Sequence, residues 1–219
     1  MRLIEPRGSQ PPPAEARCRV LRSLLPEHMF ILQSMEILDI VDETGEPTGF
    51  TVERAEAHAS GALHRTSHVW VARRRAGCVE LLLQLRSRRK ESFPSCYDVS
   101  SAGHIPAGDG FVGSALRELR EELGMTASPE ELVPCGLRRI RRRAMFAGGE
   151  FIDNQVSMVY LLWRDVDAAE VRFQRSELDG VCWTGMGECR EMVACGTPPN
   201  CIDAEELDMI DAAIASASE

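Results

Sequence analysis

The stretch from Gly103 to Met125 constrains the fold of this chain more than any other. It reads GHIPAGDGFVGSALRELREELGM and places Glu118, Glu121 and Glu122 at positions i, i+3 and i+4. On a helix, these three carboxylates fall within a sector of about 100°. Like charges at this spacing repel one another, so the helix gains from them only when a cation binds there. Carboxylates on one rigid face suit Mg²⁺ or Mn²⁺, and these ions suit substrates that carry phosphates.

The second half of this stretch predicts a helix from about Phe111 to Leu123. Gly124 follows as the expected left-handed residue that ends it. The apolar side chains of the helix lie opposite the carboxylates, and we expect them to be buried. They are Val112, Leu116, Leu119 and Leu123.

The whole stretch resembles the Nudix box, which is Gly, five residues, Glu, seven residues, and then Arg-Glu-apolar-x-Glu-Glu-x-Gly-apolar. Gly103 opens the pattern and the segment 117–125 completes it. Asp109 stands where the family has Glu, which keeps the charge on a side chain one methylene shorter. A solvated acidic helix face would explain the glutamates alone, but not the fixed spacing of the other positions. The chain is therefore identified as a member of the Nudix superfamily.

Strands interrupted by one helix and followed by helices at the end predict an α/β fold, an α/β/α sandwich with a mixed β-sheet, in which the box forms a loop and a helix. The resemblance to the Nudix box implies that Glu118, Glu121 and Glu122 hold Mg²⁺, or Mn²⁺, with help from the Gly103 carbonyl. Arg117 is expected to tie the glutamates in place. Glu121 or Glu122 is expected to accept a proton from water, and the sequence leaves the choice between them open.

The resemblance covers about residues 35 to 195 and is closest to the branch that contains isopentenyl diphosphate isomerase and related hydrolases. The segments that carry it are 63–70, 83–86, Phe93-Pro94 and 101–104. His64 and His104 stand at metal-ligand positions of the isomerase. They are expected either to bind a second metal or to form hydrogen bonds within the pocket.

Two cations and two further carboxylates are also candidates for the substrate site. Arg86 and Lys90 match positions that face the diphosphate in this branch, and the alternative is that they are solvated at a strand end. Asp153 or Glu177 could supply an additional carboxylate opposite the helix. The basic run 138–143 is either an exposed strand face or a further substrate contact.

Two positions argue against isomerase activity. Ala102 stands where the isomerase has a Cys, and Asp153-Asn154-Gln155 replaces its Glu-Asn-Glu. An isomerase needs a proton donor and a proton acceptor on opposite faces of a double bond, and neither Ala nor Gln can serve. We therefore expect hydrolysis of a diphosphate linkage. The alternatives are isomerase activity and a catalytically weak ligand-binding module, which Glu118→Gln would distinguish from an enzyme.

Composition excludes several other classes. The net charge of −9 over 219 residues does not favour a nucleic acid polymer or a membrane surface as partner. No apolar run approaches the ~20 residues of a membrane span. The eight cysteines show no Cys-x-x-Cys spacing, and reduced thiols in the cytoplasm are expected. A homodimer is expected from family habit alone.

The chain divides near Met35. Residues 1–34 are irregular and Pro-rich and are expected to form an N-terminal extension, with Met35 as the biological start. Residues 35–219 are expected to form the Nudix domain, with its C-terminal helices from about residue 187. Strands are expected at 35–42, 68–72, 79–85, 97–102, 137–146, 154–163 and 181–184. His68 is expected to be structural because it lies in a strand.

Overall fold

The computed structural model describes residues 36–216. The expected N-terminal extension, residues 1–34, lies outside this range, so neither it nor the proposed start at Met35 is tested. No helix among the described residues is long and apolar enough to cross a membrane. The seven cysteines within this range are all free thiols.

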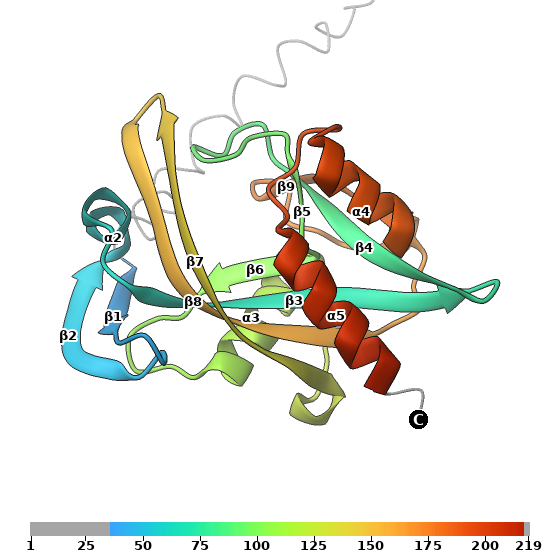
Figure 1. Ribbon diagram of the computed structural model, residues 1–219, viewed down its shortest axis with the longest axis horizontal. Helices are drawn as coiled ribbons and strands as arrows, with labels where there is room; N and C mark the ends of the chain where they lie inside the picture. Colours follow the sequence, from blue (N-terminus) through green and yellow to red (C-terminus); the bar gives the residue numbers. More distant parts are fainter. Residues whose placement is uncertain (1–35, 217–219) are drawn as a thin grey trace, which may run out of the picture. The chain divides into compact units, whose positions relative to one another are not determined.

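A seven-stranded mixed sheet forms the centre of this unit (Figure 1). Its strands are β3 (His64–Arg75), β4 (Cys78–Arg86), β5 (Tyr97–Asp98), β6 (Ser101–His104), β7 (Leu132–Phe146), β8 (Gly149–Trp163) and β9 (Leu178–Gly185). The order is β5-β4-β3-β8-β7, with β6 paired to β3 and β9 paired to β4. Strands β3 and β8 run parallel and the other pairs are antiparallel, so the predicted mixed sheet is confirmed.

Helices cover both faces of the sheet. Helix α3 (Phe111–Leu123) packs its Ala115, Leu119 and Leu123 into one hydrophobic core. Helices α4 (Met186–Cys195) and α5 (Ala204–Ser216) pack on the other face, where α5 contributes Leu207 and Ile210 to a second core. In Figure 1, α4 and α5 lie in front of the sheet and α3 lies behind it. The predicted α/β/α sandwich is therefore confirmed.

A small hairpin unit precedes the sheet. It consists of β1 (Ile37–Val41), β2 (Pro47–Glu53) and the short helix α2 (Arg54–Ser60). Two 3₁₀ turns, Pro129–Glu131 and Ala168–Glu170, complete the described elements. The sequence predicted β1 but neither β2 nor α2. Strand β2 is exposed along nearly all its length and so lacks the apolar alternation that marks a strand.

Some predicted details of burial and pairing are wrong. Val112 is exposed rather than buried, because its neighbour Phe111 is the residue of the first turn of α3 that packs against the core. The strand predicted at 97–102 is two short strands, since β5 pairs with β4 whereas β6 pairs with β3. The hairpin around Ala147 and Gly148 is confirmed, and both of its strands are longer than expected.

Candidate active site

Helix α3 presents the glutamates of the box at the edge of the central strands. Gly110 precedes its first turn, and Gly124 ends it in the left-handed conformation at φ 64°, as predicted. The buried leucines fix the rotation of the helix about its axis. As a result, Glu118 and Glu122 point toward strand β6, whereas Glu121 is half exposed.

Gly103 provides the space that Glu118 occupies. A Cβ atom at residue 103 would lie 2.2 Å from Cδ and 2.4 Å from Cγ of Glu118. No real Cβ approaches another carbon so closely, so any side chain at this position must displace the glutamate. The glycine that opens the box is therefore required by the close approach of the helix carboxylate to the backbone of β6.

We expect Gly103→Ala to lower turnover by about 10²-fold, because the added methyl group displaces Glu118. A misplacement of about 1 Å in a catalytic site costs a loss of rate of this size. The matched control is Gly110→Ala in the same loop, where a methyl group meets nothing within 4 Å. Initial rates and thermal unfolding of both variants are the measurement. Equal turnover in the two variants would show that the position of Glu118 is unimportant.

Arg117 connects the carboxylates to each other and to the loop. Its guanidinium lies 3.0 Å from Glu118 and 3.8 Å from Glu121, and it donates a hydrogen bond to the backbone oxygen of His104 at 3.2 Å. This is the geometry expected of a residue that holds the glutamates, and it offsets part of their mutual repulsion.

Two of the glutamates, the buried Glu122 and the half-buried Glu118, lie close enough for their charges to interact. Burial raises the pKa of Glu118 to about 7, against the opposing effect of Arg117. Burial, together with the charge of Glu118, raises the pKa of Glu122 to about 8. The carboxylate of Glu122 also accepts a hydrogen bond from the backbone amide of Ala102 at 3.2 Å. Two neighbouring buried carboxylates with raised pKa values form a donor set that fits a divalent cation.

The loop between β6 and α3 is held by the N-terminal hairpin. The Asp39 carboxylate accepts hydrogen bonds from the Gly108 amide and from Arg65, at 2.9 and 2.8 Å. Arg65 also donates to the backbone oxygen of Asp109 at 3.0 Å. Strand β1 thus fixes the loop from which the glutamate helix starts, a role that the sequence did not reveal.

Three histidines form a cluster on the opposite side of Gly103 from α3. Each of His58, His64 and His104 has a ring nitrogen within 4.8 Å of those of the other two. Among residues 36–216, this is the one group of three potential metal ligands that meets that distance; the glutamates of α3 do not. The ring of His58 stacks on Phe151, at a centroid distance of 4.1 Å.

The hydrogen bonds of these histidines assign their ring nitrogens. Nδ1 of His58 faces the backbone oxygen of Ile152, and Nδ1 of His64 faces that of Ala62, so each Nδ1 carries the proton and donates. In both neutral rings, Nε2 is therefore the nitrogen with the lone pair. The Nε2 atom of His64 is buried without a partner, and that of His58 lies 3.1 Å from Nε2 of His104. Burial lowers the pKa of all three rings, to about 4 for His58. Nε2 of His104 then donates to the lone pair of His58. Three neutral imidazoles with ring nitrogens this close suit a metal ion such as Zn²⁺ or Mn²⁺, which would take the place of that proton.

The predicted phosphate-binding cations lie near the site but have partners. Lys90 forms an ion pair with Glu177, and its charge acts on both His104 and Glu122. Arg86 pairs with Asp98 at 3.1 Å and donates to two backbone oxygens of the loop that follows β4. The charge of Lys90 therefore reaches both groups, whereas Arg86 anchors the loop. A direct contact of either with a diphosphate stays a prediction.

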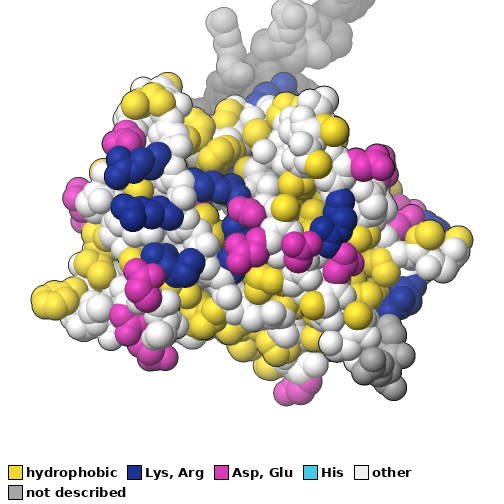
Figure 2. Space-filling model, in the orientation of Figure 1, with side chains coloured by type: hydrophobic (Ala, Val, Ile, Leu, Met, Phe, Trp, Pro, Cys, Tyr) yellow, Lys and Arg dark blue, Asp and Glu magenta, His cyan; other side chains and the backbone are white. Residues whose placement is uncertain are grey.

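The basic run 138–143 divides between the two faces of β7. Arg138 is buried and pairs with three carboxylates at the start of α5: Asp203, Glu205 and Glu206. Arg142 pairs with Asp203 at 2.8 Å. Arg139, Arg141 and Arg143 point outward, and dark-blue side chains form a column over β7 in Figure 2. The run therefore combines structural ion pairs that fix α5 with an exposed strand face.

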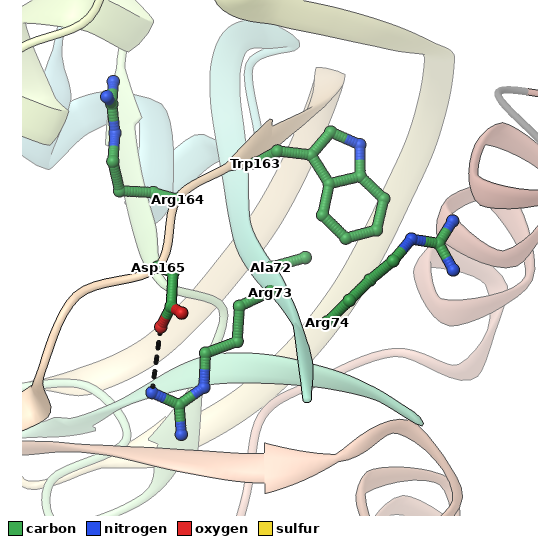
Figure 3. A pocket seen from close by; sticks show the side chains of 6 residues that line it. All are labelled: Ala72, Arg73, Arg74, Trp163, Arg164 and Asp165. Atoms are coloured by element: carbon green, nitrogen blue, oxygen red, sulfur yellow. Dashed lines mark hydrogen bonds and ion pairs between the residues drawn. The ribbon is translucent and has the colours of Figure 1, made fainter. Parts of the chain in front are cut away.

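A separate shallow pocket lies at the far end of β3 (Figure 3). Its cationic side chains are already engaged. Arg73 pairs with Glu80 and Asp165, and Arg164 pairs with Glu131. Arg74 lies over the ring of Trp163. These contacts make the pocket part of the packing at this end of the sheet.

Comparison with known proteins supports one family. Residues 62–196 match the model of the NUDIX domain. The chain is 35% identical over 161 residues to Nudix hydrolase 3 of Arabidopsis thaliana; the match covers 73% of this chain but only 20% of that longer protein. It is 36% identical over 146 residues to an uncharacterized Nudix hydrolase of Clostridium acetobutylicum, covering 67% and 68% of the two chains. An isopentenyl-diphosphate Delta-isomerase of Saccharopolyspora erythraea is 27% identical over 163 residues, 74% of this chain and 79% of that protein.

A solved structure supports the same fold. The crystal structure of DR0079 from Deinococcus radiodurans superposes with a TM-score of 0.56 at 20% identity, covering 81% of this chain and 99% of that one. An α/β/α sandwich with a glutamate-bearing loop and helix on one face of its mixed sheet is the fold of one class of proteins. The chain belongs to the Nudix hydrolase family, and the resemblance to the isomerase branch is confirmed.

Proposed function

We propose that this protein hydrolyses a diphosphate linkage in a nucleoside diphosphate derivative or another organic diphosphate, with Mg²⁺ or Mn²⁺ as cofactor. The observation that carries the proposal is the burial of Glu118 and Glu122 side by side at the box helix, with Arg117 as a neighbouring cation. Such a pair is costly without a counter-ion and is matched to a hard divalent cation.

The residues have separate roles in this proposal. Glu118, Glu121 and Glu122 hold the metal, with the carbonyl of Gly103 as a further oxygen donor. A bound Mg²⁺ neutralises phosphate charge and lowers the pKa of water. Glu121 is half exposed, so its carboxylate can accept a proton from the attacking water, whereas that of Glu122 is occupied by the Ala102 amide. Glu121 is therefore the proposed general base.

Lys90, His64, His104 and Asp153 complete the proposed site. Lys90 supplies positive charge to the phosphates, since its charge already acts on both His104 and Glu122. The histidines hold a second metal, because their ring nitrogens lie within 4.8 Å of one another and the buried Nε2 of His64 has no hydrogen-bond partner among the described residues. His58, which the sequence did not single out, completes this set.

The histidine cluster predicts a second, separable metal. Wild-type protein dialysed against Mn²⁺ or Zn²⁺ is expected to keep about one equivalent, which His64→Gln loses. Glu121→Gln is the matched control. It should keep the metal equivalent, because it changes the glutamate site on α3 and leaves the histidine cluster intact. Inductively coupled plasma mass spectrometry gives the stoichiometry. Equal retention by His64→Gln and wild type would assign the histidines to hydrogen bonding within the pocket.

The isomerase alternative is disfavoured by the environment of Gln155. Its side-chain oxygen accepts from Thr66 at 3.0 Å and its amide donates to Asp153, so it holds no transferable proton. The test is product analysis by ³¹P NMR on a panel of nucleotide sugars, ADP-ribose, dinucleoside polyphosphates and isopentenyl diphosphate. Phosphate or nucleotide release supports the proposal. Conversion of isopentenyl to dimethylallyl diphosphate without hydrolysis would overturn it.

A further inference from the structure

The loop between β6 and α3 has little packing of its own. Residues 106–110 read PAGDG, and a Cβ atom at Gly108 or Gly110 would meet nothing within 4 Å. Gly108 also has a φ of 85°, a conformation that other residues rarely adopt. Such a segment keeps one conformation only when contacts from other parts of the chain offset its loss of entropy. Its order matters, because it joins Gly103 to the first turn of the glutamate helix.

Strand β1 holds the loop from one side. The backbone oxygen of Ile37 accepts a hydrogen bond from the Ala107 amide at 2.8 Å. The Asp39 carboxylate accepts one from the Gly108 amide at 2.9 Å. An isolated β-bridge between strand and loop lies next to these two bonds, and the loop runs beside β1 in Figure 1.

Arg65 on β3 holds the loop from another side. Its guanidinium donates to the Asp39 carboxylate at 2.8 Å and to the backbone oxygen of Asp109 at 3.0 Å. It also lies over the ring of Phe111, the first residue of α3, at 5.5 Å from the ring centroid. The backbone oxygen of Arg65 accepts from the Ile105 amide at 3.1 Å. Arg65 therefore contacts the start of the loop, its end, and the helix that follows.

The carboxylate that anchors the loop is not the one within the Nudix box. Asp109 occupies the position of the box Glu, yet its side chain is exposed and its carboxylate forms no hydrogen bond or ion pair among residues 36–216. Asp39 and Arg65, by contrast, pair with each other through side chains that are only 12% and 9% exposed. Removing one charge of such a pair leaves the other without compensation, so the two act as a unit. The anchoring carboxylate of this chain comes from β1.

We propose that Asp39 and Arg65 are positioning residues for the reaction. Together they hold the loop so that the Gly103 carbonyl and the glutamates of α3 face one metal ion. The inference rests on the proposed function for the ion and the reaction. The buried leucines fix the rotation of α3, and the pair fixes how far its first turn lies from β6. Neither side chain is exposed enough to bind a substrate, so both act through the loop.

The test compares Asp39→Asn with Asp42→Asn. Asp42 is the matched control, because its carboxylate also accepts backbone amides, those of Thr44 and Glu46 at 2.8 and 3.1 Å, but only within the turn between β1 and β2. Asp39→Asn is expected to lower kcat at saturating Mg²⁺ by about 10- to 100-fold, the usual loss for a residue that supports metal ligands. KM should change less than about threefold, because no substrate contact is removed. Asp42→Asn should change neither constant, even if it lowers the Tm as much.

Two further variants test the assignment of the anchor. Asp109→Asn should lower kcat less than Asp39→Asn does, and a larger loss in Asp109→Asn would contradict the assignment. Arg65→Lys keeps a charge beside Asp39 but lacks the rigid fork that also reaches the Asp109 backbone oxygen, so kcat should fall about 10-fold. Because it preserves the ion pair, Arg65→Lys takes the place of Asp39→Asn in the comparison if circular dichroism shows that Asp39→Asn does not fold.

Metal affinity separates this inference from the proposed function. In a His64→Gln background, calorimetry should show that Asp39→Asn weakens Mn²⁺ binding by about 10-fold and that Asp42→Asn does not. If wild type hydrolyses a diphosphate and the two folded variants have equal kcat, the inference is overturned and hydrolysis stands. If wild type hydrolyses nothing, the proposed function fails and the affinities decide. A loss confined to Asp39→Asn then supports the positioning of the glutamates, and equal affinities contradict it.

Discussion

Glu122→Gln is expected to lower turnover by about 10²- to 10⁴-fold and, at the same time, to stabilise the metal-free protein at high pH. The two effects have one cause. The Glu122 carboxylate is buried beside Glu118, so its charged form is favourable only when a cation is bound. Gln keeps the size of the side chain but removes both the metal ligand and the buried charge.

The pH range of the stabilisation follows from the pKa of Glu122. Its value of about 8 in the folded protein lies above the usual 4.5, so between these values the folded state holds a proton that the unfolded state has lost. The free energy of unfolding therefore falls as pH rises through this range. The gain in free energy of unfolding that Glu122→Gln brings over wild type is absent below pH 4.5 and reaches on the order of 2–4 kcal/mol above pH 8.

Urea unfolding of both proteins in a chelator at pH 5 and pH 9 measures this difference. Glu191→Gln on α4 is the matched control, since Glu191 is exposed, and it should change neither turnover nor stability. A Glu122→Gln variant that is less stable than wild type at pH 9 would contradict the burial of a charged carboxylate. Loss of activity would then be explained by misfolding.

Metal affinity is expected to rise steeply with pH. Glu118 and Glu122, with pKa values of about 7 and about 8, are largely protonated at pH 6 and must lose these protons to bind a cation. Binding at pH 6 therefore releases up to about two protons, and affinity rises on the order of 10- to 100-fold per pH unit. Above pH 9 the dependence disappears, because both groups are already ionised.

Isothermal titration calorimetry with Mn²⁺, in buffers of different ionisation enthalpy, counts the protons released. The experiment uses His64→Gln, so that only the glutamate site is titrated. Adding Glu122→Gln to this background should reduce the count at pH 6 by about one. If His64→Gln alone releases almost no protons on binding Mn²⁺ at pH 6, the glutamates are not the ligands.

The box helix was predictable because its signals are local. Gly124, the leucines and the spacing of the glutamates all lie within one segment, and the structure ends α3 where the sequence places its end. The predicted burial of Val112 was wrong: in the first turn of α3 it is Phe111 that packs against the core, and Val112 is exposed. The long hairpin was predictable for the same reason, since its turn and strands are continuous in sequence.

Contacts between distant segments were not predictable. His68 and Glu206 are 138 positions apart, and His58 lies on a seven-residue helix that carries no motif. The basic run 138–143 appeared as one patch, but strand alternation sends Arg138 to α5 and Arg139 outward. Only the assembled sheet shows which of these residues share a face.

The most direct test of the central claim compares wild type with Glu121→Gln across the diphosphate panel, with Mg²⁺ and with a chelator. The account predicts metal-dependent release of phosphate or nucleotide from one substrate class, lost in Glu121→Gln while folding is unchanged. Turnover that survives in Glu121→Gln or in the chelator would contradict it. So would the absence of turnover from a folded wild-type protein that binds Mg²⁺.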